Sequence, residues 1–352
     1  MDYDGQCRST VTLARGAPKQ QRAGNYSNMP EELSPPLPLV VPALEPGEEW
    51  LDVILHFAGH PAKGPEAVSA PPPVAERYYL SDRIWIERLD SNVAKIITLA
   101  CNSANYNIPA IEDEGHLYAF VRKSRLPGLF SDFGGTQELG AVVSLSRLVH
   151  PTTTGLRYAA RVSLVRGEVR RAQAQQPRGV SLDVFWSKGS RRNWLTTEDA
   201  SRLKALMPYL LERRPLPKRV HIAYWHHEYA VRTYYVDHRW GLIFTGLDAL
   251  VNIDPYLGKK KFVSRIKRIA ETVGVSASEA DLERAYDLRS NLVHGQHFLY
   301  DFGQPLPKAD VELYDKIEEI LRRTLLKTFE DPSFASNFTD ESSIKKFLPY
   351  PP

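Results

Sequence analysis

The sequence predicts an α+β protein in which a β-rich or mixed N-terminal domain precedes an all-helical bundle. Short runs of β-branched and aromatic residues dominate from Trp50 to about residue 186, and apolar residues recur at helical spacing from Val220 onward. At 352 residues the chain is long enough for two cores. We therefore expect a flexible tail over residues 1–48, a sensor or substrate-selecting β-rich domain over 49–215, and a helical domain over 216–352.

Composition limits the functions that these domains can have. The formal charge of +3 is only mildly basic, so net charge alone does not indicate a nucleic-acid binder. Cys7 and Cys101 are too few for a disulfide framework and lack the spacing of a zinc site. No apolar run approaches the roughly 18 residues of a membrane span, and the N-terminus lacks an apolar signal core. We expect a cytoplasmic protein with no membrane partner.

The N-terminal domain is predicted from strand-like runs separated by Gly, Pro, Asn and Asp. Within the first 48 residues Gly, Gln, Arg and Pro give little periodicity, and Met29 is a second candidate translation start. The clearest strand candidates span residues 50–57, 83–87, 95–100, 116–121, 140–145, 156–165 and 180–186. We therefore expect a sheet-forming region here.

Helical spacing begins after residue 194. Thr196 or Thr197 is a suitable N-cap because Glu198 and Asp199 then place negative charge in the first turn, and Pro208 is expected to kink or split this helix. Further helices are expected at about residues 220–237, 240–252, 262–273, 282–292 and 309–329. Short connections between most neighbours indicate a bundle.

One stretch of the bundle, residues 285–295, combines charge with a titratable ring. Arg289 and His294 lie five positions apart in an apolar helical pattern, and Gly295 follows at once, which is a usual way for a helix to end. The pattern therefore holds an arginine and a histidine at a helix end.

The bundle resembles the HEPN superfamily, and within it the Apea-like branch, over roughly residues 220–350. The likeness rests on the order of the segments 240–250, 262–273, 286–295 and 317–327, and on an Arg followed after four residues by a His. The resemblance implies a HEPN-like bundle and a metal-independent endoribonuclease that needs no cofactor and acts in anti-phage defence or as a toxin. It also implies RNA as partner, a homodimer formed through the bundle, and a regulatory or antitoxin protein.

The chemistry of RNA cleavage suits Arg289 and His294 without reference to the family. RNA carries its own nucleophile, the 2′-hydroxyl, so a base that removes its proton and a cation that stabilises the phosphate charge are sufficient. Histidine can act as that base or protonate the leaving oxygen, and arginine can hold two phosphate oxygens. A two-fold dimer would supply the second histidine that full acid and base catalysis requires.

Supporting positions are less typical of the family. The residue after the arginine is commonly Asn, Asp or His, whereas here it is Ser290, with Asn291 one place later. Asp248 is expected either to orient Arg289 across the bundle or to be a solvated helix residue. Alternatively, Arg289 pairs with an acidic neighbour, His294 caps the helix, and the bundle is a non-catalytic module that binds a nucleotide, RNA or protein.

Basic residues could guide a phosphate backbone toward this site. The densest cluster in the bundle is Lys259, Lys260, Lys261, Arg265, Lys267 and Arg268. Binding through these residues would depend on salt, although a solvated charged face is the commoner explanation of such a run. A second set lies in the N-terminal domain and consists of Arg166, Arg170, Arg171, Arg178, Arg191 and Arg192.

Other candidate sites are less favoured. His226, His227 and Glu228 are adjacent rather than one helical turn apart, so no metal site is predicted. Tyr234, Tyr235 and Trp240 are expected in the core rather than as platforms for base stacking. Gly134 and Gly135 are not followed by the Lys-Ser/Thr of a phosphate loop.

Overall fold

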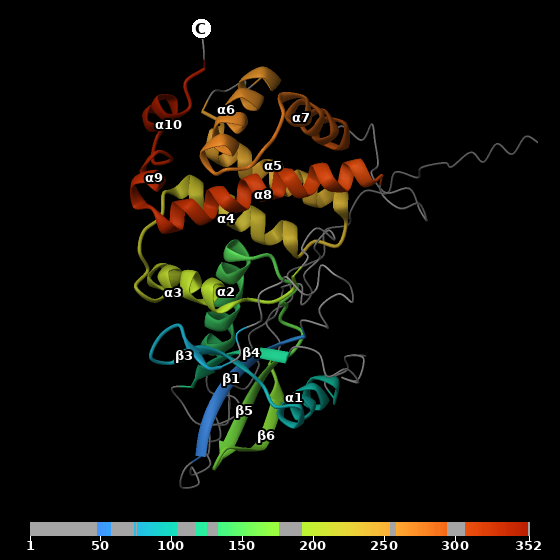
Figure 1. Cartoon of the computed structure of the whole chain (residues 1–352), viewed down its shortest axis with the longest axis vertical. Coiled ribbons are helices and arrows are strands. Elements are labelled where there is room, and N and C mark those ends of the chain that lie inside the picture. Colours follow the sequence, from blue (N-terminus) through green and yellow to red (C-terminus); the bar gives the residue numbers. More distant parts are fainter. Residues whose placement is uncertain are drawn as a thin grey trace, which may run out of the picture. The chain divides into compact units, whose positions relative to one another are not determined.

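The protein has mixed α+β structure, with an antiparallel sheet and a larger set of helices (Figure 1). The computed structural model describes residues 48–57, 74, 76–103, 117–124, 133–175, 192–253, 258–293 and 307–350. Almost all of the predicted tail, and the strand predicted at 180–186, lie outside these residues. The domain boundary near residue 215 stays a prediction.

The sheet has six strands in the order β2-β3-β4-β1-β5-β6, and every neighbouring pair is antiparallel. The strands are β1 (Glu48–Phe57), β2 (Tyr78–Tyr79), β3 (Ile84–Arg88), β4 (Leu117–Lys123), β5 (Ala159–Val165) and β6 (Glu168–Ala174). β1 lies centrally, with Val53 opposite Val121 of β4 and Ala160 of β5. The strands predicted at 50–57, 83–87, 116–121 and 156–165 are therefore confirmed in outline.

Both faces of the sheet are covered by helices. Leu51, Val53 and Leu55 of β1 share a core with the helix α1 (Ser91–Ser103), whereas Ile54 belongs to the core that contains α2 (Phe133–Val149). Successive side chains of a strand point to opposite faces, so a strand covered on both faces is buried throughout and mainly apolar, with Asp52 and His56 as the buried polar residues of β1. This is why residues 50–56 are buried without exception.

The strands predicted at residues 95–100 and 140–145 are wrong, because both segments are helical. In α1, Ala94, Ile97 and Cys101 are buried at helical spacing. In α2, residues 142–149 are all buried, so the segment lacks the polar face that marks an amphipathic helix. A short apolar run of this kind cannot be distinguished from a strand by periodicity.

The remaining helices agree with the predicted series. They are α3 (Thr197–Leu211), α4 (Lys218–Val231), α5 (Val236–Val251), α6 (Lys259–Thr272), α7 (Glu279–Val293), α8 (Lys308–Glu330), α9 (Pro332–Ser336) and α10 (Glu341–Phe347) (Figure 1). Thr196 is the N-cap of α3, in a capping box with Asp199, and α3 continues past Pro208 to Leu211. The two short final helices were not predicted.

One core joins these helices to the α2 face of the sheet. It includes Ile54, Leu139, Leu203, Phe244 and Leu321, which come from β1, α2, α3, α5 and α8. α2 packs against β1 and β4 and also against α3 and α8. No helix among the residues that the structure describes is both long and apolar enough to cross a membrane.

Candidate functional site

Arg289 of α7 lies against Asp248 of α5. The Arg289 Nη2 atom is 3.5 Å from Asp248 Oδ2, and the two side chains are 30% and 28% exposed. The structure therefore places in contact the two residues that the sequence paired across the bundle, at a position that solvent reaches.

The contact between Arg289 and Asp248 is weak enough to leave Arg289 able to bind another group. Burial raises the pKa of the Asp248 carboxyl, while the positive charge of Arg289 opposes this shift. The distance is at the long end for a hydrogen bond between an arginine and a carboxylate. Within the described part of the chain, Arg289 contacts no second carboxylate. Its guanidinium is thus held by one loose contact.

Local sequence explains how α7 presents Arg289. Ser278 and Asp281 begin the helix with reciprocal hydrogen bonds, Ser278 N to Asp281 Oδ2 at 3.2 Å and Asp281 N to Ser278 Oγ at 3.1 Å. Leu282 and Ala285 are buried and turn that face of the helix toward the core. Arg289 follows Ala285 after one helical turn, at the edge between core and solvent.

The second predicted catalytic residue, His294, lies outside the described residues. α7 ends at Val293, directly before it in the sequence. The predicted supporting residues Ser290 and Asn291 are in the last turn of α7 and are partly buried. The structure thus places Arg289, Asp248, Ser290 and Asn291 around one end of α7.

Arg265 does not belong to an exposed basic surface, contrary to the prediction. Its side chain is buried, and its Nη1 atom donates a hydrogen bond to the Val251 carbonyl oxygen at 2.9 Å. This bond reaches the last residue of α5, whose carbonyl lacks a helical partner. Arg265 therefore joins α6 to the end of α5.

Other residues of the predicted RNA-binding cluster are engaged by neighbouring groups. Lys259 pairs with Asp287 of α7 at 2.6 Å, and Lys267 pairs with Glu279 at 3.2 Å. The Lys261 Nζ atom lies 5.6 Å from the centroid of the Tyr350 ring. Lys260 and Arg268 are exposed on α6. The acidic residues of α7 thus offset part of the positive charge of α6.

The second arginine set is dispersed over the sheet and the loop before α3. Arg166 has a φ of 53° in the turn between β5 and β6, and Arg170 and Arg171 are exposed on β6. Arg192 pairs with Asp199 at 2.6 Å. Arg178 and Arg191 lie outside the described residues.

The histidines and glutamate of α4 face different partners. His227 Nε2 is 2.7 Å from Glu318 of α8, whereas Glu228 is directed to α2, where it contacts Ser144 and Arg147. The described residues include no group of three or more His, Cys, Asp or Glu side chains that could hold a metal ion. His227 and Glu228 therefore serve separate buried contacts.

The prediction that Tyr234, Tyr235 and Trp240 lie in the core is confirmed for Trp240 and wrong for the two tyrosines. Trp240 is completely buried, but Tyr234 and Tyr235 are 64% and 62% exposed. They occupy the connection between α4 and α5, where a chain reversal leaves little core to cover side chains.

Sequence reasoning missed the buried polar group around Glu228. Ser144 and Arg147 precede it in the chain by 84 and 81 residues. They fall in or beside the segment 140–145 that was predicted as a strand, so no pattern linked them to α4.

No protein-family model, curated protein or solved structure matches this chain.

Proposed function

We propose that the helical part of the chain is a metal-independent endoribonuclease of HEPN type, with Arg289 and His294 as its catalytic residues. The observation that carries the proposal is the partly exposed contact between Arg289 and Asp248 at the end of α7 that precedes His294. The resemblance of residues 220–350 to HEPN domains gives this contact its interpretation.

The proposed reaction uses each group for one task. The 2′-oxygen attacks the adjacent phosphorus, the bond to the 5′-oxygen breaks, and a 2′,3′-cyclic phosphate and a 5′-hydroxyl result. One histidine takes the proton of the 2′-hydroxyl, and a second histidine gives a proton to the leaving oxygen. Arg289 stabilises the negative charge that builds on the phosphate. Asp248 orients Arg289 until the phosphate binds.

A homodimer completes the site in this proposal. Each chain contributes one His294, so a two-fold axis beside the ends of two α7 helices would bring the two histidines together. Lys260 and Arg268, which are exposed on α6, would attract the RNA backbone, and this attraction would weaken as salt rises. A regulatory or antitoxin partner would then control access to the RNA.

RNA cleavage in EDTA tests the proposal. We expect wild-type protein to cleave RNA, and Arg289→Ala and His294→Ala each to lower the rate by at least about 100-fold, the scale for one acid–base or charge-stabilising group. Arg284→Ala is the matched control, because Arg284 also lies on α7 and pairs with Asp310 at 2.5 Å, away from Asp248. The proposal fails if folded wild-type protein leaves a mixed RNA substrate intact, or if the control loses as much activity.

A non-catalytic binding module is the second candidate, and a specific observation favours it. Lys259 pairs with Asp287, and Lys267 pairs with Glu279. Arg265 is hydrogen-bonded to the Val251 carbonyl oxygen. The basic surface is therefore smaller than the sequence suggests. Nucleotide or RNA binding that depends little on salt, is lost in Arg289→Ala and occurs without cleavage would support this candidate over the nuclease.

A further inference from the structure

A cavity of about 710 Å³ lies between α2 and α4, and α3 and α8 complete its walls. Its size falls within the range of roughly 300–1,000 Å³ that is usual for small-molecule sites. Its lining residues come from other helices than those that hold Arg289 and Asp248. The cavity is thus a second place where the molecule can receive a ligand.

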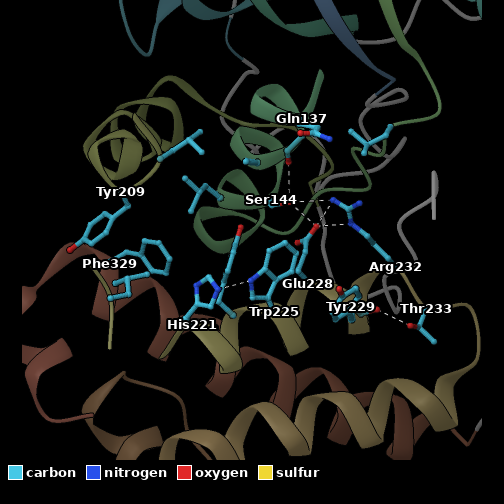
Figure 2. Close-up of a pocket in the computed structure, with 17 residues that line it drawn as sticks. Gln137, Ser144, Tyr209, His221, Trp225, Glu228, Tyr229, Arg232, Thr233 and Phe329 are labelled. Atoms are coloured by element: carbon cyan, nitrogen blue, oxygen red, sulfur yellow. Dashed lines mark hydrogen bonds and ion pairs between the residues drawn. The ribbon is translucent and has the colours of Figure 1, made fainter. Parts of the chain in front are cut away.

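Polar groups converge at one side of the cavity. Ser144 Oγ donates a hydrogen bond to Glu228 Oε1 at 2.8 Å, and Arg232 Nε donates to the same oxygen at 2.7 Å. Arg232 Nη2 also reaches Ser144 Oγ at 3.2 Å. Figure 2 shows these three side chains meeting, with Ser144 from α2 above Glu228 from α4. A fixed polar group therefore faces a largely apolar space.

This polar group has an excess of positive charge. Arg147, which is fully buried behind Ser144, is bonded through all three of its nitrogens, to Glu228, Ser144 and the Thr154 carbonyl oxygen. Burial would raise the pKa of Glu228, but the charges of Arg147 and Arg232 outweigh it and the pKa is lowered. Two guanidinium groups thus share one carboxylate, which leaves one net positive charge.

One of the three guanidinium nitrogens of Arg232 takes no part in this polar group. Its side chain is only 10% exposed, and its Nε and Nη2 atoms bind Glu228 and Ser144. Among the described residues, no partner meets its Nη1 atom. The Nη1 atom is not itself buried, so a ligand in the cavity can reach it and accept a charge-assisted hydrogen bond from it.

The helix α4, which carries Glu228, also offers aromatic surface beside the polar group. Trp225 and Tyr229 are 45% and 54% exposed, and their rings lie 5.8 Å apart at 31°. The Trp225 indole nitrogen donates to His221 Nε2 at 2.9 Å, which fixes the ring (Figure 2). Tyr209 and Phe329 line the same space with their rings 5.0 Å apart. A flat ligand can therefore stack without reorganising these side chains.

We infer that this cavity binds a small aromatic carboxylate, with its ring against Trp225 and Tyr229 and its carboxylate at Arg232. One net positive charge and one uncommitted guanidinium nitrogen match a single negative charge. A nucleotide brings more negative charge than this group balances, and the Glu228 carboxylate beside Arg232 would repel the surplus. The inference does not depend on ribonuclease activity.

Isothermal titration of the full-length chain tests the charge and the ring separately. We expect 1-naphthylacetate to bind with one site per chain and a Kd below about 1 mM. The neutral 1-naphthylacetamide has the same ring and should bind at least about tenfold more weakly, because a charged hydrogen bond is lost. AMP distinguishes a phosphate ligand from a carboxylate. Absent binding of 1-naphthylacetate, equal binding of the amide, or tighter binding of AMP would each overturn the inference.

Two aromatic substitutions locate the binding. Trp225→Ala should weaken 1-naphthylacetate binding at least about tenfold, on the scale of one aromatic contact. Tyr235→Ala is the matched control, because Tyr235 is 62% exposed but does not line the cavity. Arg232→Lys, which keeps the charge but loses the fork of nitrogens, should also weaken binding. Unchanged affinity in folded Trp225→Ala, or equal loss in the control, would place the ligand elsewhere.

Discussion

Two of the arginine–carboxylate sites that join helices in the described part of the chain differ in depth. At the first, Arg147 and Arg232 enclose Glu228, whose side chain is 4% exposed. At the second, Arg289 meets Asp248 in a single contact of 3.5 Å, and both side chains are close to 30% exposed. Glu228 accepts hydrogen bonds from both arginines, and Arg147 binds both of its carboxylate oxygens. Asp248 accepts a single hydrogen bond from Arg289.

The difference bears on what each site is suited to do. Removing one partner from a buried group leaves charge without solvation, so such a group is a poor place to exchange partners. An exposed pair contributes little to stability, and its arginine can leave the carboxylate for a phosphate at small cost. Burial thus suits the Glu228 group to hold α2 against α4, and exposure suits Arg289 to bind a substrate.

The strongest test of this difference between the two sites is to remove each carboxylate charge in turn. Glu228→Gln leaves two buried guanidinium groups without their counter-charge, and we expect the free energy of unfolding to fall by about 3–5 kcal/mol. Asp248→Asn should cost less than about 1 kcal/mol, because the pair is partly exposed. Urea unfolding at neutral pH measures both.

Glu212→Gln is the control for a surface carboxylate, since Glu212 is 60% exposed beside Arg214. Similar losses at Glu228 and Asp248 would mean that depth does not separate the two sites.

The buried side chain of His56 allows the energetic effect of burial to be tested by changing the pH. His56 donates from Nε2 to the Asn193 carbonyl at 2.7 Å, and burial lowers its pKa to about 4. The unfolded chain takes up this proton near its ordinary pKa of 6.5, whereas the folded chain resists until about 4. Stability should therefore fall as pH drops through this window, by up to about 3 kcal/mol from His56 alone.

The measurement is urea unfolding at several pH values for wild type and His56→Gln. The substitution should flatten the pH dependence, whatever it does to stability at neutral pH. Burial lowers the pKa of His150 as well, so a residual slope in the same direction is expected. An unchanged slope in His56→Gln would show that the ring is not held neutral.

The smallest expected effect concerns the helix that carries Asp248. A methyl group at Gly246 would lie 2.8 Å from Leu321 Cδ2 and 3.3 Å from the Ala223 carbonyl oxygen, whereas one at Gly241 meets nothing within 4 Å. Gly246→Ala should therefore cost about 1–2 kcal/mol, since overpacking outweighs the gain in helix propensity. Gly241→Ala should be neutral or stabilise by up to about 1 kcal/mol.

Thermal unfolding of both variants checks this pair. If Gly246 is required for the position of α5, Gly246→Ala should also change RNA cleavage, while Gly241→Ala should not. A Gly246→Ala protein as stable as Gly241→Ala would mean that α5 can move away from α4 freely.

The helices of the C-terminal part were predictable because their apolar residues recur at helical spacing. In α8, for example, Ile317, Leu321 and Leu325 are buried at helical spacing while Glu312 and Arg323 reach solvent. α1 and α2 were not recognised. α2 is buried on all sides over residues 142–149, and a helix without a polar face has no helical period to read.

The candidate sites differ in the same way. Asp248 and Arg289 each lie on a helix whose buried apolar residues recur at helical spacing, so the sequence and a family resemblance together predicted that they face each other. The burial of Arg265 was not predictable. Its hydrogen-bond partner is the Val251 carbonyl, a backbone group that every residue type carries, so the sequence does not indicate the contact. The Glu228 group was hidden for another reason, since Ser144 and Arg147 belong to the unrecognised α2.

The burial of α2 has a practical consequence for anyone dividing the chain. A fragment that starts at residue 216 would lose the Leu148 carbonyl that accepts a bond from Arg322 at 3.0 Å, and the hydroxyl and guanidinium that bind Glu228. Expressed alone, it would present these charges and the apolar surface around them to water, and we expect it to aggregate. A fragment that starts just before Phe133 keeps these groups covered but uncovers the face of α2 that packs against β1 and β4, so the better choice begins before β1.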